Sequence, residues 1–191
     1  LAFPVTLGGD FSGVAVEVGA DVKDFKKGDE VYGSAIVLGG GSGSFAEFAA
    51  AKAGAVAPKP KRASHIEAAA LPLAGVSSYQ ALVEHMKLSR GQKILIHGGA
   101  GGIGTFAIQL AKHLGAYVAA TATGDDLGYV KKLGADEAID YKTQKFEDIV
   151  KGYDAVFDTV GGETYARSFK ALKNGGIIVS MLEQPNEELM R

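Results

Sequence analysis

The sequence predicts an α/β fold in which a doubly wound parallel sheet follows a shorter region rich in β-structure. Two observations carry this prediction. After Lys93, five short apolar segments begin roughly every 20 residues, with helical patterns between them. Before residue 63, alternating segments and glycine-rich turns occur without a competing helical period. Strands that alternate with helices form βαβ units, whose parallel sheet is covered by helices on both faces.

Residues 1–62 form the predicted β-rich region. The segment GVAVEVG (13–19) alternates apolar and polar side chains, as a half-buried strand does. DEVYG (29–33) and FAEFAAA (45–51) predict two more short strands, and GGGSGS (39–44) predicts a flexible turn.

Prolines mark a boundary at residues 58–62, where the basic cluster PKPKR is interpreted as a solvated connector. The next segment, SHIE (64–67), has the Ser-x-x-Glu spacing of a capping box. It predicts the start of an alanine-rich helix, and a second helix is predicted over residues 75–86.

The remaining residues predict the parallel sheet. A helix is predicted over residues 103–115, where Phe106, Leu110 and Leu114 share one face. The five predicted strands are KILIH (93–97), AYVAAT (116–121), DEAID (136–140), DAVFD (154–158) and GIIVS (176–180).

Composition excludes several classes of protein. The 191 residues are 47% hydrophobic with a net charge of -2, so the chain can bury a core, and charge favours neither a nucleic-acid nor a membrane partner. The absence of cysteine excludes disulfides, thiolate catalysis and cysteine-ligated zinc in this chain. No membrane-length apolar run or signal peptide is visible, which favours a cytoplasmic location.

The stretch HGGAGGIG (97–104) joins the first predicted strand of the βαβ series to its first helix. Gly99, Gly101 and Gly104 have the dinucleotide-binding spacing. The first glycine permits a tight turn, the second lets the backbone approach a pyrophosphate, and the third lets the helix pack on the strand. Free N–H groups and the helix dipole hold the negative charge, so we predict a bound dinucleotide.

The end of the second strand indicates which dinucleotide. An acidic residue about 20 positions after the first glycine would bind the ribose hydroxyls of NAD. Residues 119–123 are Ala-Ala-Thr-Ala-Thr, which favours NADP(H). Asp125 and Asp126 follow without a lysine or arginine, and we interpret them as first-turn helix residues that point to solvent. NAD(H) therefore stays open as the alternative.

Segments along nearly the whole chain resemble the medium-chain dehydrogenase/reductase superfamily, specifically its zinc-free quinone oxidoreductase (zeta-crystallin-like) branch. The matching stretches are FPVTLGGDFSGVAVEVGADVKDFKKGDEVYG, LPLAGVSSYQAL, ILIHGGAGGIG, LGADEAIDY and VFDTVGG. The resemblance implies a partial GroES-like domain on the substrate side over residues 1–62. A Rossmann dinucleotide-binding domain follows over residues 63–191, incomplete at its C-terminal end. The active site would lie in the cleft between them.

The resemblance also implies which residues contact the cofactor. Ser77 would lie near the nicotinamide or the phosphates, Thr121 and Thr123 near the adenosine ribose, and Tyr141 beside the 2′-phosphate. The other implied contacts are the loop residues Gly99, Ala100, Gly101, Gly102, Ile103 and Gly104 and, along the nicotinamide half, Thr159, Val160 and Met181.

Zinc members of the superfamily carry a Gly-His-Glu-x-x-Gly motif, which matches residues 8–13 here. Gly9 stands in place of the histidine ligand, and the four histidines of the chain lack ligand spacing. We therefore predict no zinc. His97 is interpreted as a strand-end residue that makes local hydrogen bonds, not as a ligand or base.

The chain also departs from its relatives. Related NADPH enzymes often place a lysine just after the second strand, where this chain has Gly124-Asp125-Asp126. Family chains also begin earlier and run on later, so we expect this chain to be part of a longer protein, and no catalytic residue is assigned.

The resemblance implies an NADP(H)-dependent, metal-independent oxidoreductase that transfers hydride to a quinone or an α,β-unsaturated carbonyl. An enoyl-thioester reductase of the same fold and a non-catalytic nucleotide-binding family member stay open, as does a homodimer. A short-chain dehydrogenase, suggested by Tyr141 and Lys145, is disfavoured because nearly a hundred residues precede the glycine loop.

Overall fold

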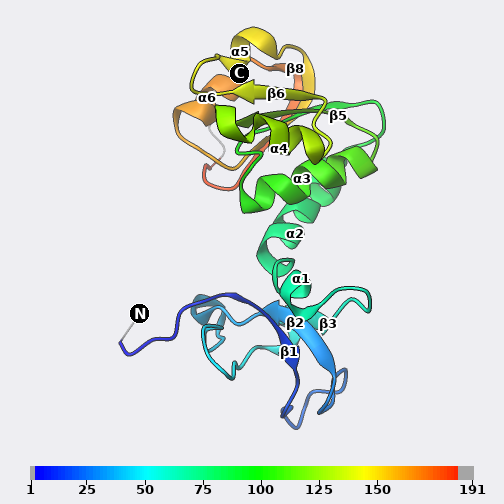
Figure 1. Ribbon diagram of the computed structural model, residues 1–191, viewed down its shortest axis with the longest axis vertical. Coiled ribbons are helices and arrows are strands. Elements are labelled where there is room, and N and C mark those ends of the chain that lie inside the picture. Colours follow the sequence, from blue (N-terminus) through cyan, green and yellow to red (C-terminus); the bar gives the residue numbers. More distant parts are fainter. Residues whose placement is uncertain (1–2, 185–191) are drawn as a thin grey trace. The chain divides into compact units, whose positions relative to one another are not determined.

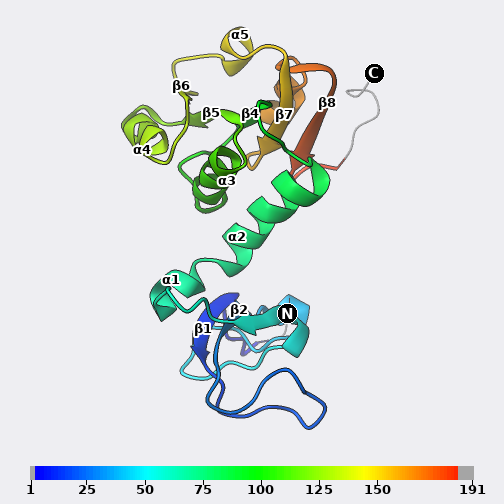
Figure 2. The same ribbon diagram turned by 90° about the vertical axis from the view of Figure 1, so that its right-hand side faces the viewer.

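The computed structural model describes residues 3–184 of the chain. The chain forms two compact units, Leu1–Val76 and Ser77–Arg191, which are described separately (Figures 1 and 2).

The first unit contains an antiparallel sheet in the order β1-β2-β3. Its strands are β1 (Asp10–Val14), β2 (Glu30–Ser34) and β3 (Val56–Pro58), with short 3-10 turns η1 (Val37–Gly39) and η2 (Ala53–Ala55). The prediction for β2 is confirmed. The strand predicted at 13–19 begins earlier, at Asp10, and ends at Val14.

The prediction of a strand at residues 45–51 is wrong. Residues 45–48 form bends, residues 49–51 have no regular structure, and the third strand is β3, where Val56 pairs with Gly33. Alanine is a weak strand former, whereas a β-branched valine packs well on a sheet, so the more apolar segment is not the one that pairs.

Two helices follow the sheet. The capping box of α1 (His65–Ala69) is confirmed, because the Glu67 N–H donates to Ser64 Oγ and the Ser64 N–H donates to the Glu67 carboxylate. Helix α2 (Pro72–Tyr79) begins before the predicted residue 75, and a π-helical segment, η3 (Gln80–His85), continues it. The Leu73 N–H donates to Asp10 Oδ2 over 3.0 Å, so β1 supplies an acceptor for the first turn of α2.

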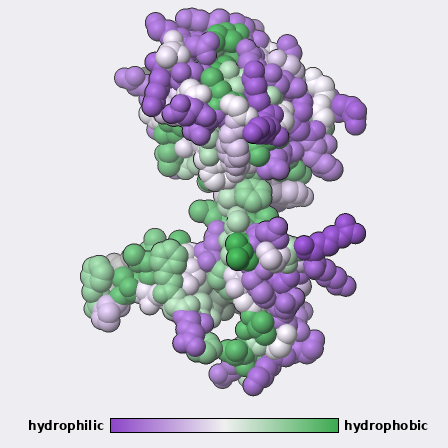
Figure 3. All heavy atoms as spheres, in the orientation of Figure 1, coloured by the Kyte–Doolittle hydropathy of each residue, from purple (hydrophilic) through white to green (hydrophobic). Residues whose placement is uncertain are grey.

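The first unit leaves apolar surface exposed. Phe3, Leu38 and Phe45 are each more than three-quarters exposed at 87%, 80% and 78%, and hydrophobic side chains gather on part of this unit in Figure 3. A hollow of about 810 Å³ beside the sheet is lined in part by Val14, Val16 and Phe48.

The second unit confirms the doubly wound parallel sheet. All five predicted strands are present in the order β6-β5-β4-β7-β8. The strands are β4 (Lys93–Ile96), β5 (Tyr117–Ala122), β6 (Glu137–Asp140), β7 (Tyr153–Asp158) and β8 (Leu172–Ser180).

Helices cover both faces of this sheet (Figure 2). One face packs against α3 (Gly102–His113), α4 (Leu127–Lys132) and η3, and the other against α5 (Phe146–Ile149) and α6 (Glu163–Ser168). A short 3-10 turn, η4 (Gly124–Asp126), precedes α4. Alternation along each central strand sends neighbouring side chains to opposite cores, as with Ile94 and Ile96 on one face and Leu95 on the other.

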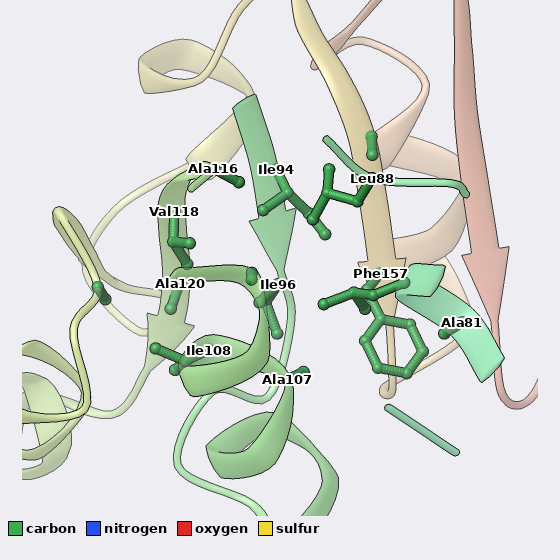
Figure 4. Close-up of a cluster of buried hydrophobic side chains, with 14 of the residues drawn as sticks. Ala81, Leu88, Ile94, Ile96, Ala107, Ile108, Ala116, Val118, Ala120 and Phe157 are labelled. Atoms are coloured by element: carbon green, nitrogen blue, oxygen red, sulfur yellow. The ribbon is translucent and has the colours of Figure 1, made fainter. Parts of the chain in front are cut away.

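Helix α3 lies against the sheet through small residues. Its buried positions are Gly104, Ala107, Ile108 and Ala111, and Ala107 and Ile108 face Ile96 and Ala120 in Figure 4. The predicted face of Phe106, Leu110 and Leu114 is only half-buried. Small side chains let the helix axis come close to the strands, which brings the first turn of α3 onto the glycine loop.

The chain divides into its two compact units between Val76 and Ser77. Helix α1 packs on β1 and β2 and so belongs to the first unit. The domain boundary predicted at residue 62 stays a prediction. No helix within residues 3–184 is both long and apolar enough to cross a membrane.

Candidate functional site

The glycine loop connects β4 to α3 at the carboxyl edge of the parallel sheet. Gly98 adopts the left-handed conformation with φ of 69°, and a Cβ atom there would lie 2.6 Å from Thr159 Oγ1. The tight turn predicted for Gly99 is therefore made by Gly98, where a side chain would be both strained and blocked.

Gly99 and Gly104 are close-packing positions. A Cβ atom on Gly99 would lie 2.9 Å from Ala120 Cβ, and one on Gly104 would overlap the Gly98 carbonyl oxygen. The first turn of α3 thus rests directly on the loop backbone, which is the role predicted for the third glycine.

Gly101 is the exposed N-cap of α3. The nearest atom to a Cβ placed there is Gly98 O at 3.2 Å, and nothing lies within 4 Å of one on Gly102. The surface above this turn is therefore open, as close approach of a ligand to the backbone requires.

The loop N–H groups divide into two sets. Those of Gly98, Gly99 and Gly101 donate within the protein, to Thr121 Oγ1, Thr121 O and Gly98 O respectively. Within residues 3–184 the N–H groups of Ala100, Gly102 and Ile103 have no hydrogen-bond partner. Unpaired donors at a helix N-terminus suit a phosphate, so this cradle fits a pyrophosphate.

The buried side chain of His97 supports the glycine loop through hydrogen bonds. Ser168 donates its hydroxyl hydrogen to Thr164 O and therefore accepts the His97 Nε2–H over 2.9 Å. His97 Nδ1 is then the acceptor for the Thr121 hydroxyl over 3.2 Å, and Thr121 Oγ1 accepts the Gly98 N–H. These hydrogen bonds connect the loop, through Thr121 of β5 and His97 just after β4, to Ser168 of α6.

Burial lowers the pKa of His97 from 6.5 to about 4, so the ring is neutral at pH 7. The Phe146 ring also packs on it edge-on, with centroids 4.5 Å apart. The interpretation of His97 as a hydrogen-bonded strand-end residue is confirmed, although its side-chain partners are distant in sequence.

The predicted ribose contacts on β5 are engaged inside the protein. Thr121 is buried, with its hydroxyl between His97 and Gly98. Thr123 donates its hydroxyl to Asp126 Oδ2 over 2.7 Å, while Asp125 is exposed as predicted. Asp126 turns back to Thr123 instead of pointing fully to solvent. Contact of either threonine with the adenosine ribose stays a prediction.

Tyr141 is exposed at the end of β6, beside β5. Its N–H donates to Ala122 O over 3.2 Å. The preceding residue, Asp140, was not singled out from the sequence, yet its Oδ2 lies 3.2 Å from where a Gly124 Cβ would stand. A carboxylate therefore does lie beside the tip of β5, supplied by the neighbouring strand.

The predicted nicotinamide-side residues lie at the ends of β7 and β8. Thr159 donates its hydroxyl to His97 O over 2.8 Å, which ties this end to the glycine loop. Val160 and Met181 are 50% and 41% exposed, so their side chains are available to a ligand. Their contact with a nicotinamide stays a prediction.

Asp158 connects the ends of β7 and β8 by hydrogen bonds, a role that the sequence analysis did not predict. This fully buried carboxylate accepts the N–H groups of Val160 and Gly161 and the Ser180 hydroxyl, over 2.9–3.2 Å. The sequence did contain a signal for this role, because Asp158 ends an apolar strand and is followed by Thr-Val-Gly-Gly.

Ser77 is half-buried in α2, and the adjacent Ser78 donates its hydroxyl to Ile103 O over 3.1 Å. This bond attaches α2 to the first turn of α3. The predicted role of Ser77 toward the cofactor is untested by the geometry.

The donor groups needed for a metal do not cluster in the part of the chain that the structure describes. No group of three or more His, Asp or Glu side chains there could hold a metal ion. The zinc-free character of the chain stays a prediction, based on its residue types.

Two families match the chain. Residues 1–61 match the alcohol dehydrogenase GroES-like domain, and residues 102–186 match the zinc-binding dehydrogenase family.

Two curated relatives are each about twice as long as this chain. It is 47% identical over 183 residues to 2-methylene-furan-3-one reductase from Solanum lycopersicum, covering 92% of this chain and 46% of the relative. It is 44% identical over 184 residues to the chloroplastic NADPH-dependent alkenal/one oxidoreductase from Arabidopsis thaliana, covering 93% and 47%. The chain thus spans about half the length of the curated relatives it matches.

Solved structures agree with the fold. An alcohol dehydrogenase superfamily protein from Novosphingobium aromaticivorans matches with a TM-score of 0.88 and 40% identity, over 98% of this chain and 58% of that one. The quinone oxidoreductase from Coxiella burnetii matches with a TM-score of 0.82 and 32% identity, over 98% and 66%.

Proposed function

The chain belongs to the medium-chain dehydrogenase/reductase superfamily, and from this premise we propose that it supplies the dinucleotide-binding part of an NADP(H)-dependent oxidoreductase. Its substrate is an α,β-unsaturated carbonyl compound or a quinone. When bound, the cofactor supplies the hydride.

The observation that carries the proposal is the open N-cap of α3. Three N–H groups, from Ala100, Gly102 and Ile103, have no partner in the described residues, and no side chain lies within 4 Å of a Cβ placed on Gly101. This arrangement provides hydrogen-bond donors and room for a pyrophosphate. Because Gly104 packs on the loop backbone, the N-terminus of α3 and the positive end of its dipole lie at the same place.

The surrounding residues fix the cradle before a ligand arrives. The Thr121–His97–Ser168 bonds and the Thr159 hydroxyl hold the loop backbone from two sides. Asp158 holds the ends of β7 and β8 together. Such preorganisation lowers the entropy lost on binding and keeps the reactive end of a dinucleotide in one orientation.

The reaction class is supported by the names of the relatives. One is an NADPH-dependent alkenal/one oxidoreductase, another reduces a methylene-furanone, and a solved neighbour is a quinone oxidoreductase. Each transfer places a hydride on an electron-poor centre. We propose that this chain serves the same chemistry without zinc, because Gly9 replaces a ligand and the chain has no cysteine.

Turnover by the full-length protein tests the proposal. With NADPH, we expect reduction of short enals, enones or quinones, and slower or no reduction of enoyl thioesters. Activity confined to enoyl thioesters would instead favour the alternative reductase, and no hydride transfer to any acceptor would favour a non-catalytic nucleotide-binding protein.

A further inference from the structure

The tip of β5 is acidic and lacks free hydroxyls. Asp125 and Asp126 follow the strand, and the Asp140 carboxylate lies beside Gly124. Thr121 and Thr123 already use their hydroxyls inside the protein. A dianionic phosphate on this side would meet carboxylates and no cation.

The other side of the β6 end has the opposite charge. The loop of residues 141–145 lines a hollow of about 470 Å³ together with Glu147 and Arg167. Arg167 is neutralised there, because it forms a bidentate pair with Glu147 over 2.8 Å and 2.6 Å.

Lys142 and Lys145 are the unpaired charges of this hollow. Both are exposed, and within residues 3–184 neither ammonium group has a hydrogen bond or ion pair. The Lys142 N–H donates to Asp140 Oδ1 over 3.0 Å, and the Thr143 hydroxyl donates to Asp140 Oδ2 over 3.0 Å. These bonds shape the turn that carries Lys142.

The hollow begins next to the tip of β5. Tyr141 lines it, and the Tyr141 N–H pairs with Ala122 O at the last residue of β5. Tyr141 is therefore shared between the end of β5 and the hollow that the two lysines line.

We propose that Lys142 and Lys145 bind the 2′-phosphate of NADP(H) at this hollow and determine the preference for NADP(H) over NAD(H). This inference rests on the proposed function. The carboxylates of Asp125, Asp126 and Asp140 repel the phosphate from the β5 side, and the two ammonium groups attract it on the β6 side. The 2′-phosphate carries close to two negative charges, which two lysines match.

The test is calorimetric binding to the full-length protein, with adenosine 2′,5′-bisphosphate and AMP as probes, then NADPH and NADH. The variant is Lys142→Gln with Lys145→Gln. The control is Lys151→Gln, which removes another exposed lysine, located before β7. We expect affinity for the bisphosphate and NADPH to fall roughly 10- to 100-fold in the double variant, and the loss to shrink at high salt.

Affinity for AMP and NADH should stay within about twofold in both variants, because neither probe carries the 2′-phosphate. An equal loss for AMP and the bisphosphate, or no loss for either, would overturn the inference while leaving the proposed function intact. Failure of the unmodified protein to bind any of the four probes would overturn both. Nucleotide binding without hydride transfer would contradict only the proposed enzyme activity.

Discussion

At the scale of single residues, the structure depends on a histidine that stays neutral. His97 is 1% exposed, and its ring joins the glycine loop to α6 through Thr121 and Ser168. Burial lowers its pKa to about 4, below the 6.5 of an exposed histidine. Between these values the unfolded chain binds the extra proton and the folded one does not, so stability falls as pH falls from 6.5 to 4. The loss contributed by His97 is on the order of 3 kcal/mol.

Urea unfolding of wild type, His97→Gln and His113→Gln between pH 7 and 4.5 measures this contribution. His97→Gln should be less stable at pH 7, because it disrupts two buried hydrogen bonds, but should lose less stability on acidification. His113 is exposed on α3, so its variant should follow the wild type. An acid dependence in His97→Gln as steep as in the wild type would contradict this role.

At the scale of elements, two glycines of the β4–loop–α3 unit have different roles, one toward a ligand and the other in packing. Gly101 has a φ of -75°, and an added Cβ would lie 3.2 Å from Gly98 O, a contact that needs only a small shift of the loop, so Gly101→Val should fold with a small loss of stability. Its side chain would occupy the space above the free N–H groups, and we expect NADPH affinity to fall at least about tenfold, or ~1.4 kcal/mol. Calorimetric titration together with thermal melting checks both halves of this prediction.

Gly104→Ala should behave in the opposite way. Alanine normally stabilises a helix interior by up to about 1 kcal/mol, but here the added Cβ would overlap the Gly98 carbonyl and approach Gly99 Cα at 2.8 Å. Overpacking should dominate and destabilise the second unit by about 1–3 kcal/mol, lowering its melting temperature. A stability equal to that of wild type would show that α3 does not rest on the loop.

The same elements show what sequence patterns can predict. The strands of the parallel sheet were identifiable because they are apolar runs separated by helical patterns, and the loop because its glycines keep a fixed spacing. The third strand of the first unit was missed, since Val56–Pro58 is too short to form a pattern of its own. Asp140, Asp158 and the inward hydroxyl of Thr121 were also missed, because their roles depend on which strand ends become neighbours in the folded sheet.

At the scale of the whole molecule, the parallel sheet brings candidate cofactor-binding residues from distant parts of the second unit to one edge. The ends of β4, β5, β6, β7 and β8 carry the loop, the threonines, Tyr141, Thr159 and Met181 respectively. In parallel sheets the carboxyl ends of all strands meet at the same edge, so residues 97 to 181 converge without any one segment being long. The proposed oxidoreductase thus relies on backbone donors at this edge, which the threonine hydroxyls hold in place.

The residue types of the chain also predict how the protein responds to chelators. Catalytic zinc needs three nitrogen, sulfur or oxygen ligands from the protein. Cysteine is absent from the chain, Gly9 occupies the position of the family's histidine ligand, and both ring nitrogens of His97 are hydrogen-bonded. His65 is engaged as well, with Nδ1 2.8 Å from Ser12 Oγ and Nε2 3.3 Å from Glu30.

We therefore expect tag-free protein to contain far less than one zinc per chain by elemental analysis, and dialysis against a chelator to leave turnover with NADPH unchanged. Stoichiometric zinc, with activity that is lost on chelation and restored by zinc, would show instead that the ligands come from elsewhere in the full-length protein and that the reaction depends on the metal.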